Sequence, residues 1–254
     1  MIRTTVIYVV NSPVLFFGCF FLLRASLWTV FEKLWYARAV PYRQVAAKDF
    51  GAELFHVFFV IPIVLFLYDQ FSSTSHPLPQ ALQNIRLSVR IALYIVITDF
   101  GYYWIHRIMH QELLWRAHKW HHSPTYMYWL AGCRATIPQQ FLVGVPYVLA
   151  APILYPAPWW IYTALIVFDY LAVDWMHLNV RLGARWIEWI FVTPRYHNIH
   201  HSSNPDHYNA NFGNLFTVWD RLFGTYVDPA TSDPEAIAFG IGEKPNPVRL
   251  IAGI

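Results

Sequence analysis

The histidines of this chain are concentrated in one region and recur at the spacing of a helix face. Ten of the twelve lie between His106 and His207. The pattern His-x-x-His-His occurs at 118–122 and again at 197–201, and a His-x-x-x-His pair occupies positions 106 and 110. Residues three and four apart share a helix face, so each group can present its imidazoles together. Imidazole binds zinc, copper, iron and nickel, and the pattern therefore predicts metal binding.

The number of clustered histidines indicates how many ions they could hold. Together with His177, these segments contain nine histidines. Burying nine imidazoles in an apolar chain only to fill space would cost free energy. A structural zinc takes four ligands, usually including cysteine. Nine ligands are too many for one closed site and suit two ions with open positions. Such a pair of redox ions can bind oxygen, and iron is favoured for attack on an unactivated C–H bond. The residues themselves leave zinc and copper open.

The other histidines lack such partners. His56 and His76 stand alone in the sequence, and we expect them to be ordinary hydrogen-bonded residues. His207 follows Asp206 in a polar segment, and the sequence leaves open whether it is a ligand.

Several residues could hold the histidines in position. Pro124 follows the first His-x-x-His-His pattern and is expected to end its helix. Thr193 and Pro194 precede the second pattern and are expected to be its N-cap and first helical residue. A metal-bound imidazole usually donates its other N–H to a carboxylate or a carbonyl oxygen. The candidates for that role are Asp99, two turns before His106, Asp174, three residues before His177, and the amides Asn179 and Asn211.

The composition predicts that these segments lie in a membrane protein. Of the 254 residues, 56% are hydrophobic and 13% are charged, whereas soluble domains carry roughly 25% charged residues. The net charge of +3 is too small to indicate nucleic-acid binding. Cys19 and Cys133 lie far apart and suggest neither a disulfide framework nor an iron–sulfur site. Because no linker or repeat interrupts the chain, we expect one domain. We divide it into N-terminal spans (1–98), a histidine region (99–228) and a tail (229–254).

The apolar segments predict an all-α integral membrane protein with about four to five membrane helices. A hydrocarbon core of about 30 Å needs roughly 20 apolar residues. The two shortest candidates flank Pro156 and Pro158 and are expected to form a tight helical hairpin. The candidate spans are 4–23, 50–68, 87–105, 141–155 and 159–175.

The basic residues predict the orientation of these helices. The segment between the first two candidate spans contains five Lys or Arg residues, namely Arg24, Lys33, Arg38, Arg43 and Lys48, and the segment 71–83 contains none. By the positive-inside rule the first segment is cytoplasmic and the second is not. All of the clustered histidines then lie on the cytoplasmic side, in a helical cap.

At these residues the chain resembles the membrane fatty acid hydroxylase and sterol desaturase superfamily. The resemblance runs from Asp99 to about Asp228 and rests on five segments. The segment LWRAHKWHHSP is also similar to the alkylglycerol monooxygenase branch. The five segments are DFGYYWIHRIMH, LWRAHKWHH, HLN at His177, TPRYHNIHH, and NFGNLFTVWDRLFGTY at 211–226.

The resemblance implies an oxygen-dependent hydroxylase or desaturase with two iron ions, which acts on a C–H bond of a lipid-like substrate such as a fatty acyl chain, a sterol or an ether lipid. Some relatives carry a further histidine where this chain has Val173, so the ligand number at one ion stays open. The WDRLFGTY segment is expected to pack over the site. The implied ligands are His106, His110, His118, His121, His122, His177, His197, His200 and His201.

The sequence also bears on partners and on rival functions. It has no haem-binding HPGG motif and no flavin or nucleotide fingerprint, so electrons are expected from a separate protein. The alternatives are a zinc-dependent membrane hydrolase, for which the chain lacks HExxH, and a non-enzymatic metal-binding membrane protein, which would carry ionisable residues midway through its spans. We expect a bacterial inner membrane first and the endoplasmic reticulum second.

Overall fold

The chain is built from helices. The computed structural model describes residues 13–72, 83–233, 235–242 and 246–254, and within these ranges it contains helices and three isolated β-bridges but no strand. The expected helical class is therefore confirmed. The longer helices are α2 (Pro13–Trp35), α3 (Tyr42–Phe55), α4 (Ile61–Ser72), α6 (Leu87–Met109), α8 (Ile137–Ala150) and α9 (Trp159–His177).

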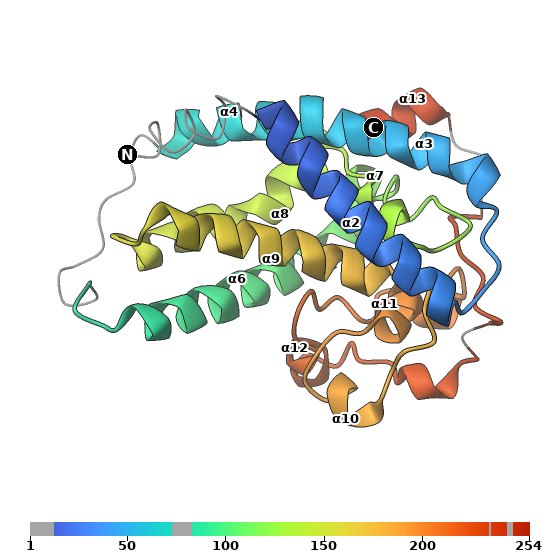
Figure 1. Ribbon diagram of the computed structural model, residues 1–254. Helices are drawn as coiled ribbons and strands as arrows, with labels where there is room; N and C mark the ends of the chain where they lie inside the picture. The colour runs from blue at the N-terminus through green and yellow to red at the C-terminus, as the bar shows by residue number, and fades with distance from the viewer. Residues whose placement is uncertain (1–12, 73–82, 234, 243–245) are drawn as a thin grey trace.

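Short helices gather at one end of the long ones. Figure 1 shows α4–α3, α8, α9 and α6 extending in roughly the same direction, with α2 crossing them obliquely. The short α-helices are α7 (Glu112–His118), α10 (Arg185–Glu188), α11 (Pro194–His200), α12 (Val218–Leu222) and α13 (Pro247–Ala252). Single helical turns of the 3₁₀ type occupy Trp129–Cys133, Ala151–Leu154, Pro205–His207 and Pro229–Thr231.

Two helical stretches among the described residues, Tyr42–Gln70 and Ile137–Leu154, are long and apolar enough to cross a membrane. They overlap the expected spans at 50–68 and 141–155. The segments 87–105 and 159–175 are helical as expected, but whether they span the bilayer stays a prediction.

The first of these stretches is one continuous helix despite Pro62. It consists of α3, a π-helical segment at His56–Val60, and α4. A proline inside a helix removes one hydrogen bond and clashes with the preceding turn. The wider π turn lies directly before Pro62, where the backbone must accommodate that ring.

Helix α2 differs from the prediction for the N-terminal segment. It continues past residue 23 to Trp35, so Arg24 and Lys33 lie in the helix and not in a loop; residues 4–12 of the expected span lie outside the described residues. Arg24 is buried because two carboxylates compensate its charge. Its Nη2 lies 2.6 Å from Asp174 on α9, and its Nη1 lies 2.8 Å from Glu53 on α3. One buried ion network therefore joins α2, α3 and α9.

The helices that carry the first and third histidine segments are held by different neighbours. Helix α6 packs chiefly on α8, and the two approach closely at Gly101, where an added Cβ would lie 2.7 Å from Cβ of Pro146. Helix α9 packs on the Trp129–Cys133 turn and on α11. This arrangement brings His106, near the end of α6, and His177, at the end of α9, to the same end of the molecule.

Candidate metal centre

The structure brings all nine clustered histidines together in two groups. In each group, one potential ligand atom per residue lies within 4.8 Å of all the others. His207 belongs to neither group, and His76 lies outside the described residues. His56 is hydrogen-bonded to Gln140, as expected of an ordinary buried histidine. The five-histidine group is His106, His110, His118, His122 and His200, and the four-histidine group is His121, His177, His197 and His201.

The first His-x-x-His-His segment is less helical than its spacing predicted. Helix α7 ends at His118, and the following residues form turns before Pro124. The His121 N–H donates to the His118 carbonyl oxygen at 3.0 Å, which is a tighter turn than an α-helix makes. The prediction of one helix through His122 was therefore wrong at its C-terminal end, although the three rings still converge.

The second His-x-x-His-His segment forms as predicted. Thr193 is the N-cap of α11, with its Oγ1 accepting the Tyr196 N–H at 3.2 Å, and Pro194 is the first helical residue. The buried carboxylate of Glu188 accepts from Thr193 Oγ1 at 2.9 Å and pairs with Arg195 at 2.6 Å. This cap and ion pair fix the start of the helix that presents His197 and His200.

Consecutive histidines are divided between the two groups. His121 and His201 belong to the four-histidine group, whereas their chain neighbours His122 and His200 belong to the five-histidine group. The rings of His122 and His201 stack with centroids 4.3 Å apart. The two groups therefore adjoin each other, and two peptide bonds link them directly.

The Nε2 atoms converge within each group. In the four-histidine group, His177 Nε2 lies 3.3 Å from that of His121 and 3.2 Å from that of His197. In the other group, His118 Nε2 lies 3.0 Å from that of His106 and 3.1 Å from that of His122. Two nitrogen ligands that are each about 2.1 Å from one ion, and about 90–100° apart around it, lie about 3.0–3.2 Å from each other.

Two further nitrogens in the five-histidine group also support metal ligation. His110 Nε2 and His200 Nε2 are buried and have no hydrogen-bond partner among the described residues. A buried polar atom without a partner costs free energy unless something satisfies it. A metal ion would satisfy both lone pairs, so the donor set fits metal ligation.

Main-chain carbonyl oxygens hold three of the rings from behind. The Nδ1 atoms of His106 and His200 lie 2.9 Å from the carbonyl oxygens of Phe212 and Ala210. His177 Nδ1 lies 2.7 Å from the carbonyl oxygen of Val173. A hydrogen on Nδ1 leaves the Nε2 lone pair free for a metal.

Asp99 does not take the position that the sequence suggested. Its carboxylate accepts from the N–H groups of Leu215 and Phe216, at 2.7 and 3.1 Å, and from Trp219 Nε1 at 2.8 Å. It lies seven residues before His106, which is about 10 Å along a helix and too far for a hydrogen bond to that ring. Asp99 instead anchors the WDRLFGTY segment beside α6, which agrees with the expected packing of that segment.

Asp174 and Asn179 also serve other purposes. Asp174 accepts from Arg24 and from Trp28 Nε1 at 2.8 Å, while the neighbouring Val173 carbonyl takes the His177 proton. Asn179 exchanges hydrogen bonds with the main chain of Arg38. Because segments distant in the sequence occupy these side chains, they do not hold the histidine rings as the sequence suggested. Asn211 likewise bonds to the main chain of Tyr196 and Val227.

The structure identifies two supporting residues that the spacing did not. Gly132 lies against His177, and a Cβ there would be 2.6 Å from the ring. Asp220 accepts from the N–H groups of Phe212 and Gly213, both at 2.8 Å, and so holds the loop whose carbonyl oxygen contacts His106. Neither residue stands near a histidine in the sequence, so only the fold shows its role.

The surroundings keep the imidazoles neutral. Burial lowers the pKa of His118, His122, His197, His200 and His201 well below the usual value for histidine, and neighbouring rings lower it further. A neutral imidazole is the form that binds a metal ion. The groups are thus in the protonation state that ligation requires.

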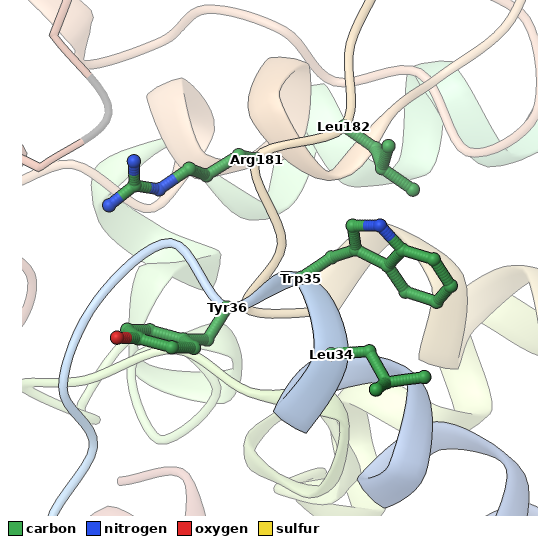
Figure 2. Close-up of a pocket in the computed structure, with 5 residues that line it drawn as sticks. All are labelled: Leu34, Trp35, Tyr36, Arg181 and Leu182. Atoms are coloured by element: carbon green, nitrogen blue, oxygen red, sulfur yellow. The ribbon is translucent and has the colours of Figure 1, made fainter.

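A surface pocket of about 370 Å³ lies apart from the histidines. It is formed where the end of α2 meets the chain that follows α9 (Figure 2). Its apolar side chains, Leu34, Trp35 and Leu182, gather on one side, while Tyr36 and Arg181 extend to the other. Arg181 is already paired with Glu235 at 2.5 Å. No histidine lines this pocket, so it is not part of the candidate centre.

Comparison with known proteins places this histidine region in one family. The fatty acid hydroxylase family matches residues 91–225, which is more than half of the chain. This range contains all nine residues of the two groups. No solved structure matches the chain.

Curated relatives include three kinds of lipid oxidoreductase. An alkylglycerol monooxygenase from Xenopus tropicalis is 31% identical over 56% of this chain and 31% of its own length. The ornithine lipid hydroxylase OlsE from Rhizobium tropici is 33% identical over 62% of this chain and 47% of its own length. A probable Delta(7)-sterol 5(6)-desaturase from Neurospora crassa is 31% identical over 54% of this chain and 38% of its own length. The chain thus matches less than half of the length of these relatives.

Proposed function

The chain belongs to the fatty acid hydroxylase family, and we propose that it is a non-haem di-iron enzyme that uses oxygen to hydroxylate or desaturate a lipid-like substrate. The observation that carries this proposal is the pair of adjoining histidine groups. The relatives' names include hydroxylation, monooxygenation and desaturation of lipids. A fatty acyl chain, a sterol and an ether lipid are all suitable substrates.

The histidine groups would hold one iron ion each. These ions would supply the oxygen chemistry, with electrons from a separate protein. The chain's own residues exclude water by burying the rings, and the carbonyl oxygens of Phe212, Val173 and Ala210 hold the Nδ1 protons so that Nε2 faces the ion. Orientation, electrostatics and exclusion of water are what a protein contributes to such a centre.

The arrangement of carboxylates supports oxidation over zinc-dependent hydrolysis. A hydrolase needs a general base near the open position of its ion. Both groups consist of histidine alone. The carboxylates of Asp99, Asp174 and Asp220 accept hydrogen bonds from N–H donors of other segments.

The proposed setting is a membrane, with the histidines on its cytoplasmic side. The two long apolar stretches support this, as does the meeting of all nine histidines in two adjoining groups. We favour a bacterial inner membrane, with the endoplasmic reticulum as the second choice.

The test is metal content and oxygen use. Protein purified in mild detergent after iron-supplemented expression should contain about two metal ions per chain, mainly iron. Oxygen consumption should require both a reductant and lipid. His197→Ala should lose metal and oxygen use, whereas His207→Ala, outside both groups, should retain them. A single zinc ion with no second metal would overturn the di-iron assignment, and zinc bound in place of iron should give no oxygen use.

A further inference from the structure

Helix α9 carries a carboxylate that neither the histidine groups nor the ion network uses. Asp169 is partly buried and accepts a hydrogen bond from Tyr147 of α8 at 2.7 Å. The Asn214 side chain is its second donor. Among the described residues no Lys or Arg pairs with Asp169; Arg90, the buried arginine of α6, donates to the carbonyl oxygens of residues 153 and 155. An ionisable side chain without a cation in an apolar helix indicates a functional site.

Asp169 has accepting capacity left. A carboxylate offers about four lone-pair positions, and two neutral donors occupy only some of them. Asn214 is 94% buried, and its Oδ1 has no partner among the described residues. The pair therefore presents unused acceptors, which a donor group on a ligand would satisfy.

The segments that carry these acceptors also position two of the histidines. Asp169 precedes His177 on α9 by eight residues, about 12 Å along the helix. Tyr102 interacts electrostatically with Asp169. It precedes His106 by one helical turn, and the centroids of the two rings are 5.4 Å apart. Asn214 follows Phe212, whose carbonyl oxygen bonds to His106, by two residues. A group bound at Asp169 would thus lie about two helical turns from the histidines.

An apolar groove lies on the same two helices, nearer to their N-terminal ends. It has a volume of about 290 Å³, and its walls come from the N-terminal halves of α6 and α9. On α9, Ile161, Leu165 and Asp169 follow at intervals of four residues, so they lie along one face. On α6, Ile95 precedes Tyr102 by seven residues on a similar stripe. The groove is lined by Ile91, Ile95, Ile161, Ala164, Leu165 and Phe168.

We propose that this groove binds the alkyl chain of the lipid substrate and that Asp169, held by Tyr147 and Asn214, accepts a hydrogen bond from a hydroxyl or ammonium group of the same lipid. The proposal rests on the proposed function, since it assigns the polar group and the chain of that enzyme's substrate. The substrate is then a lipid whose reacting carbon lies on the side of the donor group and not at the far end of the alkyl chain. An alkyl chain without a donor leaves the carboxylate unsatisfied and binds less tightly.

Binding can be measured without turnover. The metal-containing protein in detergent is kept under argon without reductant, and each probe displaces tritiated hexadecan-1-ol. The probes are hexadecan-1-ol, hexadecylamine and hexadecyl methyl ether, which share a chain and differ in the donor. The wild type should prefer the alcohol and the amine over the ether by roughly 10–100-fold, as for a hydrogen bond to a charged group.

Three variants separate the parts of the proposed subsite. Asp169→Asn should abolish the preference for the amine and reduce that for the alcohol, and Tyr147→Phe should reduce both in the same direction. Ala164→Trp fills the groove and should weaken all three probes equally. Asp206→Asn, an exposed carboxylate change, should match the wild type.

Two outcomes would overturn the proposal, and both are distinct from failure of the proposed function. One is wild-type discrimination in Asp169→Asn with full metal content. If Asp169→Asn does not fold, unchanged discrimination in Tyr147→Phe is the other. Failure of the proposed function would appear separately, as intact discrimination among the probes in a protein that consumes no oxygen with any lipid.

Discussion

His106 on α6 and Phe212 in the loop after α11 are joined by a hydrogen bond of 2.9 Å from the imidazole Nδ1 to the main-chain carbonyl oxygen. The N–H of the same Phe212 donates to Asp220 at 2.8 Å. The side-chain oxygens of Asp220 also accept from Thr225 and from the hydroxyl of Tyr196. Asp220 does not contact a histidine, yet it helps to orient His106 through the backbone of Phe212.

Asp220→Asn should weaken metal binding at the five-histidine group. The amide replaces one acceptor oxygen with an NH₂ that faces the N–H of Phe212 or Gly213, so the loop must shift. Loss of an outer partner of a metal ligand typically lowers metal affinity or activity about 10–100-fold. Metal retained per chain during titration with a chelator measures this, with the exposed Asp206→Asn as control. Retention equal to the wild type would show that the loop does not depend on the charge.

Gly132→Ala should disturb the four-histidine group selectively. The added Cβ would lie 2.6 Å from the His177 ring, so the ring or the turn must move. We expect the metal content to fall from about two ions per chain to about one. Gly51→Ala is the matched control, because its Cβ meets nothing within 4 Å. Loss of both ions in Gly132→Ala would mean that the two groups bind metal only together. Loss of neither ion would mean that the Trp129–Cys133 turn can shift without disturbing the metal ligands.

Asp174→Asn should act on stability more than on metal geometry. It removes the charge that compensates buried Arg24, and breaking a buried ion pair from one side typically costs about 3–5 kcal/mol. The thermal unfolding midpoint in detergent should therefore fall clearly. The exposed pair of Arg181 and Glu235 provides the control, since Arg181→Gln should change the midpoint little. A midpoint unchanged in Asp174→Asn, with lower turnover, would instead favour a role at His177.

Cysteine labelling in sealed vesicles tests the orientation. With Cys19 and Cys133 both replaced by Ser, Asp206→Cys near the histidines should react only from the cytoplasmic side. Asn84→Cys, before the opposite end of α6, should react only from the other side. The prediction follows from the excess of Lys and Arg on one side. Reaction of both cysteines from the same side would contradict the orientation, because α6 would then not cross the bilayer.

Eight of the nine histidines could be identified from their local spacing, whereas His177 stands alone and was included through the family resemblance. His197, His200 and His201 share a helix face whatever surrounds that helix. The apolar helices could be predicted from the length of their uncharged segments. The N-cap at Thr193 and the helix start at Pro194 could also be predicted, because they depend on two adjacent residues.

The partners of the polar residues close to the histidines in the sequence could not be predicted, because they come from distant segments. Its position three residues before His177 predicted that Asp174 orients that ring, whereas its partner is Arg24, 150 residues earlier. Proximity along the chain also favoured carboxylates behind the rings, whereas main-chain carbonyl oxygens occupy that place. Every residue has a main-chain carbonyl oxygen, whatever its side chain. The sequence therefore does not distinguish Phe212, Ala210 and Val173 from other residues.

The division of His200 and His201 between the two groups has a consequence for biosynthesis. The five-histidine group is incomplete until His200 has been translated. The four-histidine group needs His177, His197 and finally His201. Neither ligand set can be complete on a ribosome-bound chain that ends before residue 200. Both then become complete within two consecutive residues. For the proposed di-iron enzyme, metal loading is therefore expected to be a late event in synthesis, because neither group has its full set of ligands before residue 200.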